Sequence, residues 1–120
     1  MLQSDFTVSS IWVTNPGNNI EDNHLAGGDY YGIFYNLQDK TTGVSDICPS
    51  GTALGRSNGN YIHSFAQQGL RITELIPRKF PCASPRNTNN PDDQWLFNPS
   101  VPTIFSNYVL YRNGNEGVLI

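Results

Sequence analysis

The chain has 120 residues, a formal net charge of −3 and an isoelectric point near 5.1. Basic residues form no cluster beyond Arg78 and Lys79, which argues against a nucleic-acid-binding protein. The length allows one domain with a modest apolar core, and the abundance of Asn, Gly, Pro and Tyr is typical of secreted β-rich domains.

The amino end, residues 1–6, has neither a basic region nor an apolar run, so it does not match a secretory signal peptide. No stretch of the chain reaches the length of a membrane span. We therefore expect no membrane span within this sequence, and any signal for export would have to come from sequence outside it.

Three stretches share one template: an Asn, an aliphatic residue two positions later, and then a Gly followed by two apolar residues that are separated by one residue. They begin and end at Asn23–Tyr35, Asn60–Ile72 and Asn107–Ile120. The Asn-to-Gly distance is nine residues in the first two copies and ten in the third, which indicates one inserted residue in the third copy. A repeated unit of this kind indicates a repeat architecture.

Each unit is too short for a pair of helices and alternates with period two, so it reads as two short strands joined by a tight turn. We predict an all-β protein, a fragment of a right-handed parallel β-helix (solenoid) in which successive rungs stack about 4.8 Å apart. Residues 1–120 would be a single partial domain. Aligning the copies predicts three inward columns: Leu25, Ile62 and Val109; Ile33, Leu70 and Val118; and Tyr35, Ile72 and Ile120.

The repeated Asn and Gly have expected structural roles. The amides of Asn23, Asn60 and Asn107 would bond to one another as a ladder along the stack. The Gly of each copy would permit a positive φ where the chain turns a corner. Ser57 stands in a column that Ile20 and Ile104 fill with apolar groups, which predicts a less well packed rung.

Two loop insertions, about residues 36–54 and 73–102, interrupt the rungs. Both follow the same strand of the repeat, so they should leave from the same corner and lie side by side. Each carries one cysteine, Cys48 or Cys82, and a disulfide between them is favoured by this geometry and by the export-like composition. Two unpaired thiols, or pairing with cysteines elsewhere in a longer chain, remain the alternatives.

The carboxyl end, Leu119–Ile120, falls inside an expected strand with no polar segment after it. A solenoid needs caps at both ends to stay soluble. We therefore expect the sequence to be an internal slice of a longer coil, with the remainder of that β-helix chain as its immediate partner.

The order and spacing of several motifs carry a resemblance to a known family. They include Ile11-Trp12-Val13-Thr14-Asn15-Pro16-Gly17-Asn18-Asn19-Ile20, Tyr31-Gly32-Ile33-Phe34-Tyr35, Asn60-Tyr61-Ile62-His63-Ser64 and Phe80-Pro81-Cys82. Over about residues 8–120 the chain resembles the β-helix region of the fibrocystin and fibrocystin-L family, which is shared with the cell-migration-inducing hyaluronan-binding protein. The cysteine-bearing insertions are more similar to fibrocystin-L.

The resemblance implies a piece of a large ectodomain at the cell surface or outside the cell, membrane-anchored in the fibrocystins and secreted or anchored in the hyaluronan branch. The fibrocystin branch implies a receptor-like protein without catalysis. The hyaluronan branch implies binding and depolymerisation of that polysaccharide. We expect a non-catalytic structural and interaction segment, with a hyaluronan-binding or hyaluronan-depolymerising ectodomain as the alternative.

Side chains that could carry chemistry give little support for an enzyme. Glu21 and Asp22 point to opposite faces of a strand and cannot act as the paired carboxylates of a glycosidase. His24 and His63 would lie on neighbouring rungs with Cβ atoms roughly 7–8 Å apart, too far for a bidentate metal site without further help. His63 and Ser64 would diverge as adjacent strand residues. We predict no catalytic residue, no cofactor and no metal site.

Two outward rows are candidate ligand contacts. The first comprises His24, Tyr61 and Tyr108, and the second comprises Phe34 and Arg71 followed by Leu119. Arg71 beside Phe34 would form a cation–π pair. Flat rows of aromatic and hydrogen-bonding side chains suit an extracellular polysaccharide or a protein ligand. The alternative is that the insertions fold over these rows and bury them as a second core.

Overall fold

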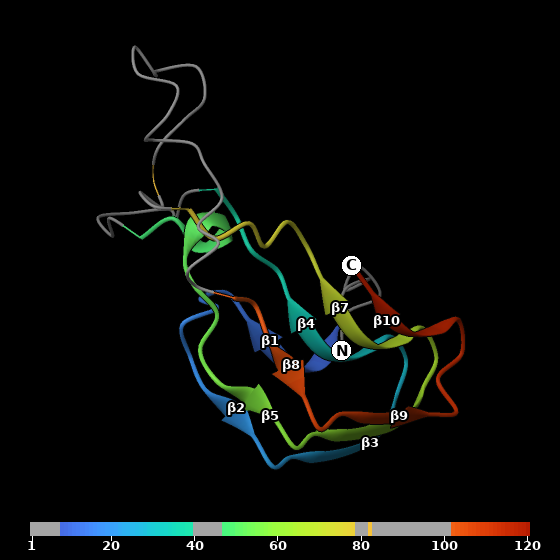
Figure 1. Ribbon diagram of the computed structural model, residues 1–120. Helices are drawn as coiled ribbons and strands as arrows, with labels where there is room; N and C mark the ends of the chain where they lie inside the picture. Colours follow the sequence, from blue (N-terminus) through green and yellow to red (C-terminus); the bar gives the residue numbers. More distant parts are fainter. Residues whose placement is uncertain (1–7, 40–46, 79–81, 83–101) are drawn as a thin grey trace.

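The computed structural model describes residues 8–39, 47–78, 82 and 102–120 (Figure 1). Their secondary structure is ten short β-strands and one 3₁₀ turn. In chain order these are β1 Ser9–Val13, β2 Ile20–Glu21, β3 His24–Gly28, β4 Tyr31–Tyr35, η1 Pro49–Gly51, β5 Ser57–Asn58, β6 Tyr61–Phe65, β7 Gln68–Ile72, β8 Phe105–Ser106, β9 Val109–Tyr111 and β10 Glu116–Leu119.

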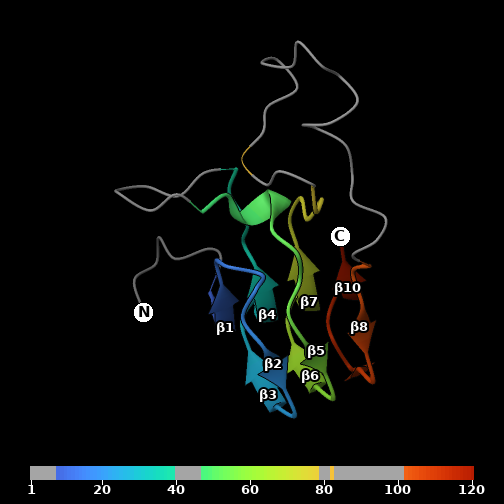
Figure 2. The same cartoon turned by 60° about the vertical axis from the view of Figure 1, so that its left-hand side comes forward.

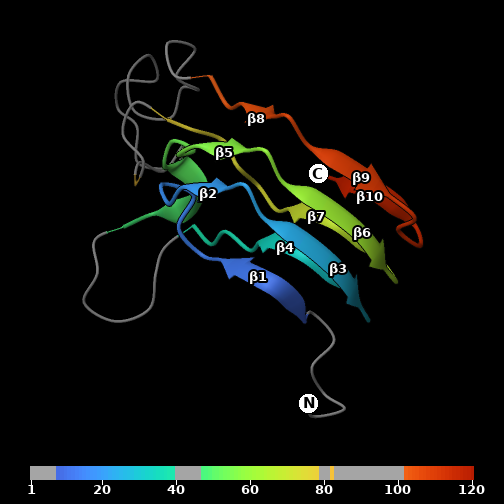
Figure 3. The same ribbon diagram turned by 90° about the horizontal axis from the view of Figure 1, so that it is seen from below.

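The strands form three sheets, and every described pairing is parallel. Their orders are β1-β4-β7-β10, β2-β5-β8 and β3-β6-β9. The four-stranded sheet is seen strand beside strand in Figure 2, and β2, β5 and β8 follow one another in Figure 3. From β2 onward the chain visits the three sheets in the same order three times, at residues 20–35, 57–72 and 105–119, which we call rungs one, two and three. The expected all-β, parallel arrangement is confirmed.

The core lies between the sheets and combines the predicted columns of rungs one and two with Val13, Leu37 and Phe65. Ile33 pairs with Leu70, and Leu70 pairs with Val118, so the second column is confirmed over three rungs. Tyr35 pairs with Ile72, whereas Ile120 lies beyond β10 and is 84% exposed. Ile33 and Tyr35 are fully buried. Strand alternation therefore places these side chains as the sequence indicated.

The register of the third rung differs by one residue from the register that the Asn template predicts. Ile62 pairs with Leu25 and with Leu110, so Leu110 completes the first column and Val109 does not. Tyr108 therefore occupies the position of Asn60. Counted from Tyr108, the distance to Gly117 is nine residues, as in the other copies, and the third rung contains no insertion. A slip of one residue exchanges the inward and outward sets of a strand, so the predicted outward row changes too.

Asn107 matches the Asn of the sequence template, but it occupies a different position, the corner that precedes the strand. Asp22, Gly59 and Asn107 occupy the same corner in the three rungs, and all have positive φ, 56°, 74° and 53°. Asn and Asp tolerate this left-handed conformation better than most residues. Asn107 is therefore a corner residue. The next corner also has a positive φ in every rung. Its equivalent residues are Gly27, Ser64 and Arg112, with φ of 83°, 65° and 54°.

The repeated Gly of the template has a different role from the expected one. Gly32, Gly69 and Gly117 are absent from the positive-φ residues. A Cβ on Gly32 would lie 2.4 Å from Ile62 Cγ2 and 2.6 Å from the carbonyl oxygen of Gly69. Glycine is required here because the first column of side chains fills the space.

The two insertions lie side by side, as predicted. The amide of Ile76 donates to the carbonyl of Ser50 at 2.8 Å, and the amide of Arg78 donates to the carbonyl of Gly51 at 3.0 Å. Cys48 and Cys82 form a disulfide with their Cα atoms 5.1 Å apart. Residues 40–46, 79–81 and 83–101 of these insertions lie outside the described part. Within the described part, no helix is long and apolar enough to cross a bilayer.

Candidate functional site

The outer face of the β3-β6-β9 sheet carries two adjacent rows of side chains. His24, Tyr61 and Val109 are paired across the three strands, and so are Ala26, His63 and Tyr111. Tyr61 is 49% exposed and Tyr111 is 43% exposed. We call the surface formed by His24, Tyr61, His63 and Tyr111 the ring face.

The four rings of the ring face contact one another. The centroid of His24 lies 5.9 Å from that of Tyr61 and 5.3 Å from that of His63, and His63 stacks on Tyr111 at 4.6 Å with an interplanar angle of 13°. The Nδ1 atom of His63 is hydrogen-bonded to Ser64 Oγ at 2.8 Å. The face is therefore a continuous, partly pre-ordered array of flat groups.

The rings of His24 and His63 contact each other across diagonal positions of the sheet, because ring side chains span that separation. One geometric prediction about the histidines was wrong. His63 and Ser64 do not diverge, because Ser64 has a positive φ and leaves the strand alternation. The sequence also missed Tyr111, since its place on this face follows only from the corrected register.

Tyr108 does not belong to the outward row. It turns inward, and its hydroxyl and that of Tyr35 are both hydrogen-bonded to the hydroxyl of Ser57, the Tyr35 contact at 3.0 Å. Ser57 is 2% exposed and pairs with Ile20 and Phe105. Ser57 is thus the centre of a buried hydroxyl cluster, with Phe105 instead of Ile104 in its column.

Burial raises the pKa of Tyr35 to about 12, only partly opposed by its hydrogen bond to Ser57, and burial also raises the pKa of Tyr108. A phenol whose pKa is raised on folding keeps its proton more tightly in the folded chain than in the unfolded chain. Its contribution to stability is therefore complete below the unfolded pKa, about 10, and is lost as the pH rises toward the folded value.

We expect the melting temperature to fall between pH 9 and pH 11.5, a range that spans roughly the unfolded tyrosine pKa. The drop should be smaller in Tyr35→Phe, which has no phenolic proton at this position. Tyr61→Phe is the matched control on the exposed face and should melt like the parent at each pH. Parallel pH profiles for the parent and Tyr35→Phe would show that this proton is not the cause.

The outer face of the four-stranded sheet holds the second predicted row. Phe34 pairs with Arg71, and Arg71 pairs with Leu119. The Cζ atom of Arg71 lies 5.8 Å from the ring centroid of Phe34, as the predicted cation–π pair requires, and 5.7 Å from that of Tyr31. Trp12, which the sequence did not single out, stacks on Phe34 at 6.0 Å and is 52% exposed.

Phe34 itself is only 4% exposed. This row therefore offers Trp12 and Arg71 to solvent, while Phe34 supports them from beneath. The ring face offers more accessible aromatic surface and is the stronger candidate site.

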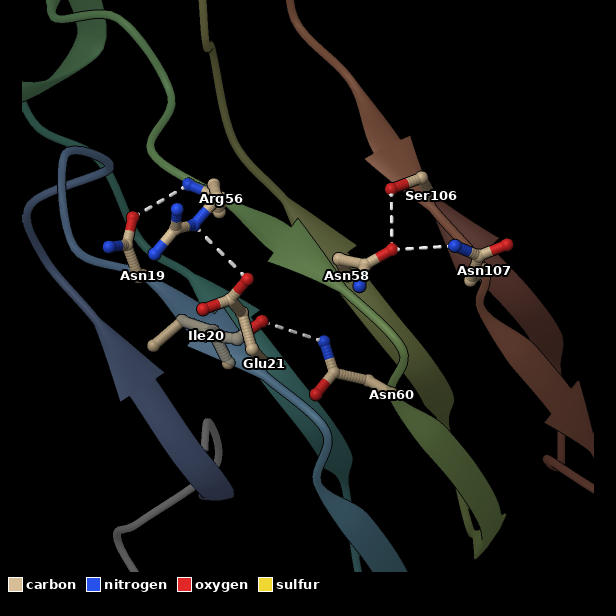
Figure 4. Close-up of polar contacts among 8 residues, drawn as sticks. All are labelled: Asn19, Ile20, Glu21, Arg56, Asn58, Asn60, Ser106 and Asn107. Atoms are coloured by element: carbon tan, nitrogen blue, oxygen red, sulfur yellow. Dashed lines mark hydrogen bonds and ion pairs between the residues drawn. The ribbon is translucent and has the colours of Figure 1, made fainter.

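The predicted Asn ladder joins rungs one and two but does not continue to rung three. Asn60 Oδ1 accepts hydrogen bonds from the Nδ2 and the main-chain amide of Asn23, at 3.0 and 3.1 Å. Figure 4 shows the third bond, in which Asn60 Nδ2 donates to the Ile20 carbonyl at 3.0 Å. Asn107 Nδ2 instead donates to Asn58 Oδ1 at 2.7 Å. The expected ladder bond between Asn60 and Asn107 is therefore wrong, because Tyr108 takes the position opposite Asn60 and Asn107 bonds to Asn58 at the corner.

A cavity of about 260 Å³ lies at the end of β3. Its lining is Val8, Ser9, Ser10, Gly27, Gly28, Asp29, Tyr30, Tyr31 and Phe65. Asp29 is the single carboxylate among these described lining residues, whereas glycoside hydrolysis uses a pair. The cavity can offer hydrogen bonds and ring surfaces to a ligand. Its described lining holds one carboxylate where a glycosidase uses two.

The fold and the ring face define a parallel β-protein of stacked rungs that presents an exposed aromatic surface. The family described as CEMIP beta-helix matches residues 2–70, which is more than half of the chain. The chain belongs to this family.

Several curated proteins are similar to the chain. Fibrocystin-L of Mus musculus is 39% identical over 77 residues, which cover 62% of this chain and 2% of that protein. Fibrocystin-L of Homo sapiens is 36% identical over the same length. The cell surface hyaluronidase CEMIP2 of Homo sapiens is 26% identical over 133 aligned residues, 94% of this chain and 9% of that protein.

The chain therefore spans a small part of the length of these curated relatives. No solved structure gives a significant match. The expected relation to a β-helix region shared by the fibrocystin-L and hyaluronidase proteins is confirmed.

Proposed function

We propose that the chain is a non-catalytic structural and interaction segment of a large, fibrocystin-like ectodomain, located at the cell surface or outside the cell. In this proposal residues 1–120 form one partial domain of a right-handed parallel β-helix, with loop insertions at about 36–54 and 73–102. Nearly all crossovers between parallel strands of one sheet are right-handed, which supports this hand. The parent would be membrane-anchored or secreted.

The ring face carries this proposal. A stack of parallel strands is a rigid support, and Tyr61 and Tyr111 expose large flat rings that can pack against the C–H faces of sugars while their hydroxyl groups bond to sugar hydroxyls. We propose an extracellular polysaccharide as its ligand. The Cys48–Cys82 disulfide supports an oxidising compartment.

Binding to size-defined hyaluronan and to a neutral polysaccharide of similar length tests this role. We expect the Tyr61→Ala/Tyr111→Ala double variant to lose at least tenfold in affinity for the polymer that the chain binds, about 1.4 kcal/mol, because it removes both exposed tyrosine rings of the face. Trp12→Ala is the matched control, because it removes an exposed ring from another sheet. Equal binding by the double variant, or binding to neither polymer, would contradict the proposal.

The alternative is a segment of a hyaluronan-binding or hyaluronan-depolymerising ectodomain. The similarity to a cell surface hyaluronidase over 94% of the chain favours it. Product sizing in the same assay separates the two: shortening of hyaluronan that is lost in Arg71→Ala supports the alternative. Unchanged polymer length, with retention that does not depend on Arg71, supports the non-catalytic role.

A further inference from the structure

His24 and His63 are the two histidines of the chain, and they meet on the ring face. They come from neighbouring parallel strands, β3 and β6, where His63 pairs with Ala26, two residues along the strand from His24. Their ring centroids are 5.3 Å apart. His24 is exposed and His63 is half-buried, so an ion in solution can reach this pair.

This separation fits two ligands of one metal ion. A zinc–nitrogen bond of about 2.0–2.1 Å and a tetrahedral angle place the centroids of two coordinating imidazoles about 5 Å apart. The two rings meet edge to face, with an interplanar angle of 61°, so coordination would keep their separation but turn the rings until one nitrogen of each faces the ion.

The surroundings of His63 prepare it for this role. Its Nδ1 atom is engaged by Ser64 Oγ at 2.8 Å, which leaves Nε2 as the nitrogen open to a metal. Stacking on Tyr111 fixes the plane of the ring. Metal-bound histidines usually have such an oxygen partner on the other nitrogen, because it sets the tautomer and the ring orientation.

We propose that His24 and His63 form a bidentate surface site for a divalent transition-metal ion of the class that imidazole prefers, Zn²⁺, Cu²⁺ or Ni²⁺. The described residues hold no group of three His, Cys, Asp or Glu side chains placed to share an ion. Water or an oxygen atom of a ligand would complete the coordination. The site does not depend on the polysaccharide proposed above.

Titration with Zn²⁺ alone, followed by ¹⁵N NMR of the imidazole nitrogens, tests the site without interference from other donors. With two histidines in the chain, each ring gives its own signals. We expect one nitrogen of each ring to shift in a single saturable step, at one Zn²⁺ per chain. Independent midpoints for the two rings would overturn the proposal.

Substitutions provide the second arm. In His24→Gln, we expect the Zn²⁺ concentration at the midpoint of the His63 ¹⁵N shift to rise at least tenfold. In His63→Gln, we expect the same rise for the ¹⁵N shift of His24. Glu74→Gln removes an exposed carboxylate outside the ring face and should bind Zn²⁺ as the parent does. An unchanged midpoint in either histidine variant, with its circular dichroism unaltered, would show that the rings do not share an ion.

Discussion

Replacing Asn60 by Leu should destabilise the chain by about 3 kcal/mol, since buried groups left without partners each cost about 1–3 kcal/mol. Asn60 is fully buried, and three hydrogen bonds of its side chain join Ile20 of β2 and Asn23, before β3, to the turn before β6. Leucine has the same number of side-chain heavy atoms and the same branching, but it cannot accept from Asn23 or donate to the Ile20 carbonyl. Chemical denaturation at neutral pH measures the difference.

A matched variant separates this effect from the general loss of an asparagine. Asn18 is exposed and its side-chain amide donates once, to the Asn15 carbonyl at 3.2 Å. Asn18→Leu should change the stability by no more than about 0.5 kcal/mol, as surface substitutions usually do. Equal stabilities for the two variants would show that the buried amide does not hold the rungs together.

Replacing Gly32 by Ala should also lower the stability by about 3 kcal/mol, at the upper end of the usual cost of overpacking. The added methyl group would lie 2.4 Å from Ile62 Cγ2 and 2.6 Å from the carbonyl oxygen of Gly69. The second contact is with the main chain of the next rung, which cannot move without disturbing the pairing of β4 and β7. Thermal unfolding would reveal the loss.

Gly27→Ala distinguishes crowding from backbone strain. Gly27 has a φ of 83°, but an added Cβ there meets no atom within 4 Å. It should cost about 1–2 kcal/mol, the typical penalty for an L-residue in the left-handed region. If Gly27→Ala were the more damaging variant, conformational freedom would outweigh space as the reason for the repeated glycine.

The parallel stacking could be predicted from the sequence because rungs one and two have the same alternation of apolar residues and the same spacing from Asn to Gly. The register of rung three could not be read correctly, since Asn107 serves a corner conformation while Asn60 serves a buried hydrogen-bond network. Both roles select asparagine, and a local pattern cannot separate them. Only the pairing of Ile62 with Leu110 resolves the ambiguity.

The same slip limited the prediction of the site. His24, Tyr61, Phe34 and Arg71 lie on outer faces as predicted, but Tyr108 is inside and Tyr111 takes the outward place. The contact between His24 and His63 depends on side-chain direction, and the bond between His63 and Ser64 depends on a left-handed residue. Neither feature is encoded in strand periodicity.

The Cys48–Cys82 bond encloses all of rung two, residues 57–72. If the ends of the chain were pulled apart, tension would pass through the sulfur atoms and bypass this segment. Rung two could be peeled from its neighbours but not drawn out into an extended thread until the bond was reduced. The middle of the stack is therefore protected against mechanical extension by covalent connectivity, independently of the strength of its packing.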